Sequence, residues 1–397
     1  LRTLTVIQDA VKFIKQETGV DIDIDHIDYD DKKVFELITS GKTEGIFQLE
    51  SSGMKNFMKE LKPQSLEDVI AGISLYRPGP MDFIPNYING KEHPEKITYD
   101  VPELQEILEP TYGCIVYQEQ VMQIVMKLAG YTLGRSDLVR RAMSKKKADV
   151  MAKERQYFVY GNEELGVPGC IARGIPEATA NKIFDDMTDF AKYAFNKSHA
   201  ACYAVVAYRT AYLKSYYPAE FMASMLNSFL GNLDKVPEYI DECKRIGIKI
   251  LKPDINSSSS KFTVEFDESQ NKNNQIGQIR FGLGSIKNVG LQPIDNIIKD
   301  RNEHGKFEGF TDFCERVEGE AVNKKCVESL IKAGAFDEFP ETRATLLASF
   351  EAIMDLAQSY NKKGMNGQVS MFDLGGEQEE NNLKEIKYQF SEQEEMT

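Results

Sequence analysis

Segments with helical periodicity, interrupted by glycine or proline, run through most of this sequence and restrict its fold more than any other feature. Residues 102–130 hold two such segments, each ending at a Pro or Gly, and residues 177–228 are strongly helical. The alternation of apolar and polar residues that is typical of strands occurs only over 248–283. We therefore predict a mainly α fold with a small β element.

Further patterns predict individual elements. Three prolines and two glycines within 75–90 predict a loop with a tight turn. The stretch 135–161 predicts one long basic helix that begins at a Ser136 cap. Residues 279–301 have the form of a helix, a small Gly-containing hairpin and a second helix, and 323–339 resembles a degenerate copy of it.

Composition limits the kinds of protein that fit. With 48 Lys and Arg against 62 Asp and Glu, the net charge is −14, which excludes a uniformly basic nucleic-acid coat but not a local basic patch. Six scattered cysteines without a CxxC pair favour reduced thiols over a zinc site. No apolar run reaches about 18 residues, so no membrane span is expected. The start lacks both a Met and a signal-peptide layout, and we expect a fragment of a cytoplasmic protein.

Basic residues are concentrated in 140–155, where seven Lys or Arg stand against two acids. Five of them lie close together, namely Arg140, Arg141, Lys145, Lys146 and Lys147. Such neighbours repel one another unless a polyanion neutralises them. A solvated helix face is the plainer explanation, but the contrast with the acidic chain favours a polyphosphate-binding role.

A second candidate anion site is the turn FNKSH at 195–199, where Lys197, Ser198 and His199 precede an apolar helix. Donors at a helix N-terminus suit an anion because the free backbone N–H groups and the helix dipole add to them. A lone histidine is more often structural. Here it shares a turn with a lysine and a capping-type serine, which favours a functional role.

The alternating aspartates Asp21, Asp23 and Asp25 could present carboxylates to Mg²⁺ from one face of a strand, as a metal-dependent nuclease would require. No apolar strand surrounds them, and the acidic run continues to a helix start. We favour a solvated acidic linker.

The predicted hairpin at 287–290 can contact a sugar-phosphate backbone through main-chain N–H groups, with Lys287, Asn288 and Gly290 as the candidate residues. The signal is weak by itself, because any short hairpin between helices needs a glycine.

An apolar pentapeptide interrupts the polar C-terminal tail, and it consists of Gln368, Val369, Ser370, Met371 and Phe372. Apolar anchors in such a tail predict a linear peptide that docks into an apolar pocket of a partner. The alternative is a tail segment that folds back on its own core.

At these residues the chain resembles the C-family replicative DNA polymerases, the alpha subunits of bacterial DNA polymerase III. The stretches that carry the resemblance occur in the family's order and cover nearly the whole chain: LRTLT (1–5), DDKKVFEL (30–37), IFQLESSGM (46–54), LYRPGP (75–80), LEPTYGCIVYQEQVMQI (108–124), RRAMSKKK (140–147), FAKYAFNKSHAACYA (190–204), YPAEFMA (217–223), LKPDIN (251–256) and LIKAGAFD (330–337).

The resemblance implies a domain order. The end of the palm and an acidic connector would occupy 1–28, a helical fingers domain 29–250, a tandem helix-hairpin-helix domain that binds DNA and clamp 251–345, and the clamp-binding peptide with an acidic tail 346–397. The family's catalytic aspartates would lie upstream of Leu1, so this chain would hold no catalytic or metal-binding residue. Mg²⁺ would be held by the missing palm, and the fragment alone would be inactive.

The resemblance also assigns roles. The triphosphate of an incoming dNTP would meet Arg141, Lys145, Lys146, Lys147, Lys197, Ser198 and His199. Arg77 and Gln118 would shape the wall of the active site. Primer-template DNA would meet the hairpin at 287–290, the sliding clamp (the beta subunit) would bind 368–372, and other replisome subunits would be further partners.

A different class of protein remains as an alternative, a non-catalytic scaffold that binds DNA through helix-hairpin-helix motifs and binds the clamp through the tail peptide. Such a scaffold has no use for the basic stretch and the FNKSH turn. Nucleotide-dependent protection of these lysines would separate the two.

Overall fold

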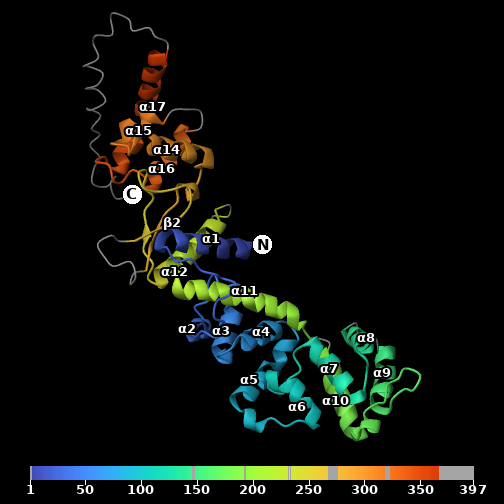
Figure 1. Cartoon of the computed structure of the whole chain (residues 1–397). Helices are drawn as coiled ribbons and strands as arrows, with labels where there is room; N and C mark the ends of the chain where they lie inside the picture. The colour runs from blue at the N-terminus through green and yellow to red at the C-terminus, as the bar shows by residue number, and fades with distance from the viewer. Residues whose placement is uncertain are drawn as a thin grey trace, which may run out of the picture. The chain divides into compact units, whose positions relative to one another are not determined.

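The computed structural model describes residues 2–144, 148–191, 194–230, 232, 234–266, 276–317 and 322–365. By its internal contacts the chain divides into two compact units, Asp23–Ser215 on the one hand and Leu1–Ile22 with Tyr216–Thr397 on the other. Helices dominate both units, and the strands of the described part form one small sheet (Figure 1). The predicted mainly α fold with a small β element is confirmed. The predicted domain boundaries stay a prediction.

The unit Asp23–Ser215 is helical throughout. Its elements are α2 (Lys32–Ser40), α3 (Ser52–Leu61), α4 (Leu66–Leu75), α5 (Ile84–Glu92), α6 (Pro102–Leu108), α7 (Gln118–Ala129), α8 (Leu133–Ser144), α9 (Ala148–Tyr160), α10 (Glu177–Ala191) and α11 (Lys197–Tyr216), with short 3₁₀ turns η1 (Pro80–Phe83), η2 (Pro94–Lys96), η3 (Glu109–Thr111) and η4 (Ile171–Arg173). One continuous apolar core, from Val34 to Ala211, joins these helices.

Local sequence explains how these helices begin and end. The Asp31 side chain accepts hydrogen bonds from the backbone N–H groups of Lys33 and Val34 and so caps α2. Gly130 ends α7 with a φ of 77°, a left-handed conformation that glycine adopts without strain. The acidic stretch that precedes α2 is not helical, as predicted.

The predicted loop over 75–90 is wrong in its second half. The 3₁₀ turn η1 begins at Pro80, and α5 begins at Ile84 and includes Pro85. Proline is tolerated in the first turn of a helix, because the N–H that it lacks has no partner there. The prolines of this stretch therefore lie at helix starts as well as in a loop.

The predicted single basic helix over 135–161 is also wrong. Its residues form two helices, α8 and α9, which pack against each other. The Arg135 guanidinium lies 2.6 Å from the carboxylate of Glu154, and the Tyr131 hydroxyl donates to the same carboxylate at 3.0 Å. In one straight helix, positions 135 and 154 would be about 28 Å apart. The helix starts at Leu133, where Thr132 rather than Ser136 accepts a backbone hydrogen bond.

The second unit combines the sheet with two groups of helices. Its elements are α1 (Arg2–Thr18), α12 (Pro218–Ser228), α13 (Val236–Arg245), β1 (Ile250–Leu251), β2 (Thr263–Glu265), β3 (Gln278–Arg280), the 3₁₀ turn η6 (Leu283–Ser285), α14 (Leu291–His304), α15 (Phe310–Arg316), α16 (Lys324–Ala333) and α17 (Arg343–Met365). The strand order is β1-β3-β2, with β3 parallel to β1 and antiparallel to β2. Helices α1, α12 and α13 contact this sheet.

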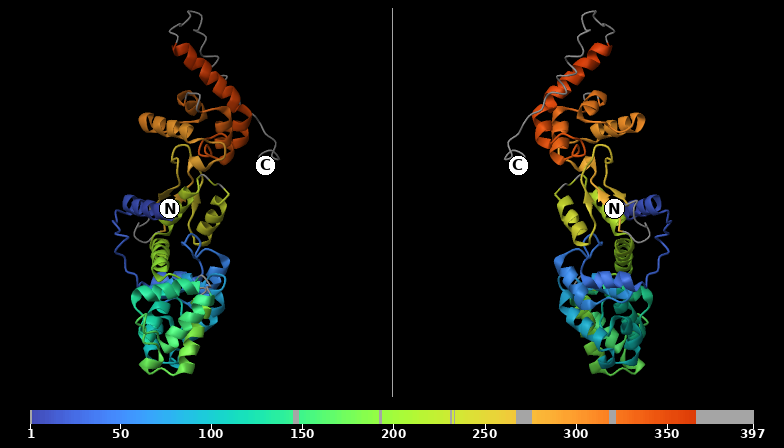
Figure 2. Two further views of the ribbon diagram at one scale, coloured as in Figure 1. Left: turned by 90° about the vertical axis from the view of Figure 1, so that its right-hand side faces the viewer. Right: turned by 90° about the vertical axis from the view of Figure 1, so that its left-hand side faces the viewer.

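Helices α14 to α17 share a separate apolar core that runs from Ile255 to Ala357, and Figure 2 shows them gathered in orange and red. The predicted hairpin lies directly before α14. Its expected first helix is wrong, because residues 278–280 pair into the sheet as β3 and only the turn η6 follows. Helix α16 ends at Gly334, which has a φ of 83°.

Candidate functional site

The turn that precedes α11 is held beside the start of α7 by backbone hydrogen bonds. The Phe195 N–H donates to the Val116 carbonyl at 3.1 Å, and the Gln118 N–H donates to the Phe195 carbonyl at 2.9 Å. Tyr117 and Phe195 thus form a short parallel bridge. Helices α7 and α11, which are far apart in the sequence, therefore start beside each other.

Two residues predicted for the active-site wall contact this turn. The Gln118 side-chain amide donates to the Ala194 carbonyl at 3.0 Å. The Arg77 guanidinium lies over the Phe195 ring, 4.4 Å from its centroid, and its Nε donates to the Ser74 carbonyl at 3.0 Å. Burial lowers the pKa of Arg77, although the group stays charged. The structure therefore brings Arg77 and Gln118 together at the FNKSH turn.

Lys197 begins α11 and directs its ammonium towards a carboxylate. Its Nζ lies 3.0 Å from Glu67 Oε2 and 5.3 Å from the centroid of the Tyr117 ring. Tyr117 is almost fully buried, and its hydroxyl has no hydrogen-bond partner within the described part of the chain. Burial raises the pKa of Tyr117, so this hydroxyl stays protonated.

A carboxylate of the chain already lies at the N-terminus of α11, where the sequence predicted an external anion. The backbone N–H of Lys197 faces both oxygens of Glu119, at 3.1 and 3.0 Å, and the Asn196 side chain donates to Glu119 at 2.9 Å. A carboxylate is stabilised there by the helix dipole. The sequence analysis missed Glu119, although it directly follows Gln118 in YQEQ.

Ser198 and His199 are exposed on the first turn of α11. The capping side chain is Asn196, whose Oδ1 accepts from the His199 N–H at 2.8 Å, and not Ser198. The His199 ring packs 4.4 Å from the ring of Tyr203. Both predicted residues thus lie on the surface beside Lys197.

Arg140 of helix α8 contacts Gln118 beside the FNKSH turn. Its Nη1 donates to Gln118 Oε1 at 2.8 Å, while its Nε and Nη2 donate to Asp137 at 2.8 and 2.7 Å. Arg141 is more exposed and lies 2.7 Å from the other oxygen of Asp137. The sequence placed both Arg140 and Arg141 in the basic cluster, but the family resemblance assigned a phosphate contact to Arg141 alone.

The remaining basic candidates, Lys145, Lys146 and Lys147, lie outside the described residues. The described basic candidates Arg140, Arg141 and Lys197 are each paired with a carboxylate of the chain. Hydrogen bonds from Arg140 lower the pKa of Asp137, and interactions with Arg141 act in the same direction. Bound anions would therefore exchange places with internal carboxylates.

The hairpin before α14 presents its backbone on the surface. Lys287, Asn288 and Gly290 are exposed, whereas Ile286 and Val289 on either side are buried. Asn288 has a φ of 66°, and this left-handed residue reverses the chain. Gly290 is exposed and precedes α14 without a side-chain cap, so the first N–H groups of the helix receive no capping hydrogen bond from it.

The three aspartates of the acidic stretch each have a different partner. Asp21 pairs with Lys15, Asp23 with His26, and Asp25 with Arg209, each at 2.8 Å. Across the described ranges no group of three or more His, Cys, Asp and Glu side chains is placed to hold a metal ion. The pentapeptide 368–372 lies outside these ranges.

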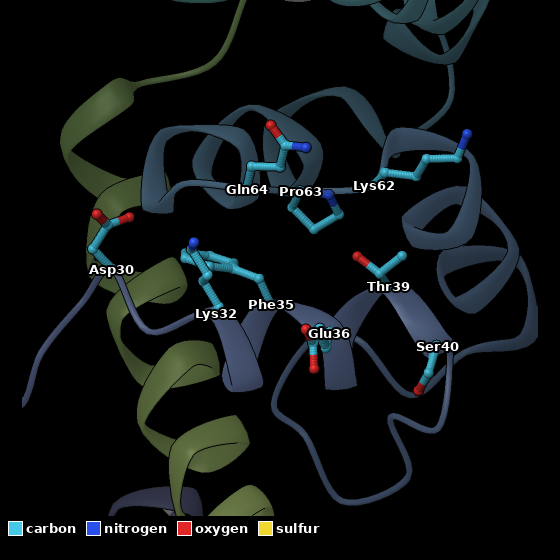
Figure 3. Close-up of a pocket in the computed structure, with 9 residues that line it drawn as sticks. All are labelled: Asp30, Lys32, Phe35, Glu36, Thr39, Ser40, Lys62, Pro63 and Gln64. Carbon is cyan, nitrogen blue, oxygen red and sulfur yellow. The ribbon is translucent and has the colours of Figure 1, made fainter.

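A cavity of about 700 Å³ lies between α2 and the connection from α3 to α4 (Figure 3). Phe35 and Pro63 contribute apolar surface, and Lys32, Glu36 and Gln64 contribute polar groups. None of the residues that the sequence predicted for a site lines it. Charges of both signs surround it, so it favours no single class of ligand.

Comparisons with known proteins agree with these features. Residues 3–166 match the family model of the bacterial DNA polymerase III alpha subunit finger domain, and residues 247–346 match that of a helix-hairpin-helix motif. The chain is 45% identical over 377 residues to the DNA polymerase III subunit alpha of Thermus aquaticus, covering 94% of this chain and 29% of that protein. The subunit of Bacillus subtilis is 44% identical over 360 residues, covering 91% and 31%.

The chain thus spans about 30% of the length of the curated relatives that it matches. Within the described residues, no helix combines the length and the apolar character that crossing a membrane would require.

Proposed function

Because this chain belongs to the family of bacterial DNA polymerase III alpha subunits, we propose that it supplies the fingers and the helix-hairpin-helix region of a DNA-directed DNA polymerase. The whole protein would elongate primed DNA in chromosome replication, in the cytoplasm and together with other replisome subunits. Its substrates are primer-template DNA and dNTPs.

The meeting of Arg77, Gln118 and Lys197 around one turn carries the nucleotide-binding part of this proposal. We place the triphosphate of the incoming dNTP on this surface, with Lys197, Ser198 and His199 on one side. Arg140 and Arg141 approach from α8, followed in the sequence by 145–147. Nucleotidyl transfer builds up negative charge on the leaving pyrophosphate, and cationic donors held in place stabilise that charge.

We assign the metal chemistry to another part of the polymerase. As the family resemblance implies, Mg²⁺ would be held by aspartates of the palm and would activate the 3′-hydroxyl of the primer. The described residues offer no group that fits Mg²⁺, so no step through the metal is derived for this chain. We expect the 397-residue chain alone to be inactive in primer extension; extension by the purified chain would contradict this.

Primer extension by the intact subunit tests the nucleotide site. Lys197→Ala removes one charged contact to phosphate. Because Lys197 exchanges its pair with Glu67 for that contact, the loss should lie at the lower end of about 1.5–3 kcal/mol, and kcat/KM for dNTP should fall about tenfold. Lys332→Ala is the matched control, because Lys332 pairs with Glu328 on the surface of the other unit. Equal values for both variants would overturn the assignment.

We further propose that the hairpin at 287–290 grips the DNA backbone. Exposed Lys287, Asn288 and Gly290 can offer an ammonium and main-chain N–H groups to phosphates, while Ile286 and Val289 anchor the turn in the core. Such contacts position DNA without reading its sequence.

The tail peptide 368–372 is proposed to bind the sliding clamp. Surface plasmon resonance with immobilised clamp would compare the chain with a variant carrying Gln368→Ala, Met371→Ala and Phe372→Ala. Loss of binding in the variant is expected. Unchanged binding would move the contact elsewhere. Binding of DNA and clamp without any triphosphate-dependent protection of Lys197 or of the lysines at 145–147, even with primed DNA and a supplied palm, would favour the non-catalytic scaffold instead.

A further inference from the structure

A second cavity in the unit Asp23–Ser215, of about 390 Å³, has a lining unlike that of the nucleotide surface. It is bordered by η1, α5, α6, α7 and α10. Its apolar lining consists of largely buried side chains, among them Leu104, Leu108, Ile115, Ile124, Ile183 and Phe190. The Phe190 ring lies 4.3 Å from that of Phe83, so aromatic surface is available as well.

The charged lining of this cavity is acidic. Asp100, Asp186 and Asp189 stand against the single ammonium of Lys182, which gives 1 − 3 = −2. Lys182 is itself bound to both oxygens of Asp100, at 2.6 and 2.8 Å. Asp189 has an interaction of its own, so Asp186 on α10 is the lining carboxylate on which an external cation can act.

The surroundings of Asp186 disfavour its charged form, so a nearby cation would stabilise it. Burial raises its pKa, and the charges of Asp100, Asp185 and Asp189 act in the same direction against the opposing effect of Lys182. The preceding residue, Asp185, does not line the cavity and is paired with Arg155. Neighbouring carboxylates of one helix therefore differ in their surroundings.

We propose that this cavity binds a small ligand with an apolar or aromatic body and a cationic amine at one end. Its volume lies within the range of small-molecule sites, roughly 300–1,000 Å³, and apolar lining with a few charged groups is typical of them. The apolar body is removed from water against α6 and α7, and the ammonium pairs with Asp186. An anionic ligand of the same shape is repelled.

The thiol of Cys114 lines the cavity and provides a local reporter. Burial raises the pKa of Cys114 to about 11, so it reacts slowly with iodoacetamide, whereas Cys202 is exposed and serves as the internal reference. Phenethylamine, phenethyl alcohol and hydrocinnamate are probes of similar shape and different charge. Peptide mass spectrometry of the alkylated 397-residue chain measures both thiols at once.

Phenethylamine should slow the alkylation of Cys114 without affecting Cys202, and should act at about three- to fivefold lower concentration than the alcohol. Hydrocinnamate should give no protection. Protection by all three probes alike, or by none, would overturn the proposal.

Two variants test the location. Asp186→Asn should weaken phenethylamine protection about three- to fivefold, whereas Asp185→Asn, which removes the same charge from a residue outside the lining, should weaken it clearly less. Asn86→Trp fills the cavity from an exposed lining position and should abolish protection. Equal effects of the two aspartate variants would mean that overall charge, and not this cavity, attracts the amine.

Discussion

Replacing Glu119 by alanine removes the carboxylate that holds the start of α11. The carboxylate accepts from the Lys197 N–H at 3.0 and 3.1 Å and from the Asn196 amide at 2.9 Å. Hydrogen bonds to a charged group contribute about 1.5–3 kcal/mol, and the lower value applies because Glu119 is half-buried. The charge at the helix N-terminus adds about 0.5 kcal/mol. We expect Glu119→Ala to lower the free energy of unfolding by about 2 kcal/mol.

Thermal unfolding of the 397-residue chain measures this effect. For a unit of the size of Asp23–Ser215, about 2 kcal/mol corresponds to a decrease in Tm of about 4–8 °C. Glu119→Gln keeps an acceptor oxygen without the charge and should lose about half as much. The control is Glu106→Ala, which removes an exposed carboxylate paired with Lys127 and should change stability by less than about 0.5 kcal/mol.

A second measurement is the Tm in the presence of inorganic pyrophosphate. Once Glu119 is gone, the N–H groups at the start of α11 are open to an external anion, so pyrophosphate should raise the Tm of Glu119→Ala more than that of the parent chain. If Glu119→Ala unfolds like Glu106→Ala and gains nothing from pyrophosphate, Glu119 does not hold this turn and the argument fails.

Three further predictions concern other parts of the chain. Lys287→Glu should weaken binding of the chain to duplex DNA in fluorescence anisotropy and reduce its salt dependence, whereas Lys299→Glu on the following helix, α14, should not; equal losses would contradict a specific hairpin contact. Glu154→Gln should cost about 2–3 kcal/mol in urea unfolding, because it leaves Arg135 poorly paired in a largely buried place, and a loss below about 0.5 kcal/mol would speak against the packing of α8 on α9. Gly334→Ala should cost about 1–2 kcal/mol, since Gly334 has a φ of 83°, and an unchanged urea midpoint would refute that strain.

Much of the helical framework was predictable from the sequence, because helix ends depend on neighbouring residues. Gly130 and Gly334 end helices through their own backbone freedom, and Asp31 caps the helix that follows it. The packing of α8 against α9 was not predictable in this way. It is fixed by contacts such as that of Arg135 with Glu154, and a basic stretch without a clear breaker fits one helix as well as two.

In the candidate site, too, local features were predictable from the sequence and long-range contacts were not. The FNKSH turn is a local pattern, and its position at a helix N-terminus follows from the sequence. Its contacts with Arg77 and Gln118 join residues far apart in the chain, and no spacing rule predicts them. Glu119 was not predicted for a further reason: cationic donors mark an anion site in a sequence, but no local pattern shows that a carboxylate of the chain itself occupies the anion position.

The carboxylates around the cationic groups have a consequence for selectivity. Lys197 pairs with Glu67, while Arg140 and Arg141 share Asp137. A polyanion that approaches this surface must replace these partners, so its net gain is the difference between two ion pairs and not the full energy of one. A single phosphate gains little from such an exchange. A triphosphate can exchange several partners at once, and because one ligand makes all the contacts, the small gains add without a new association cost for each. Internal counter-ions in a chain of net charge −14 thus suppress casual binding of anions and favour a ligand that spans the whole surface.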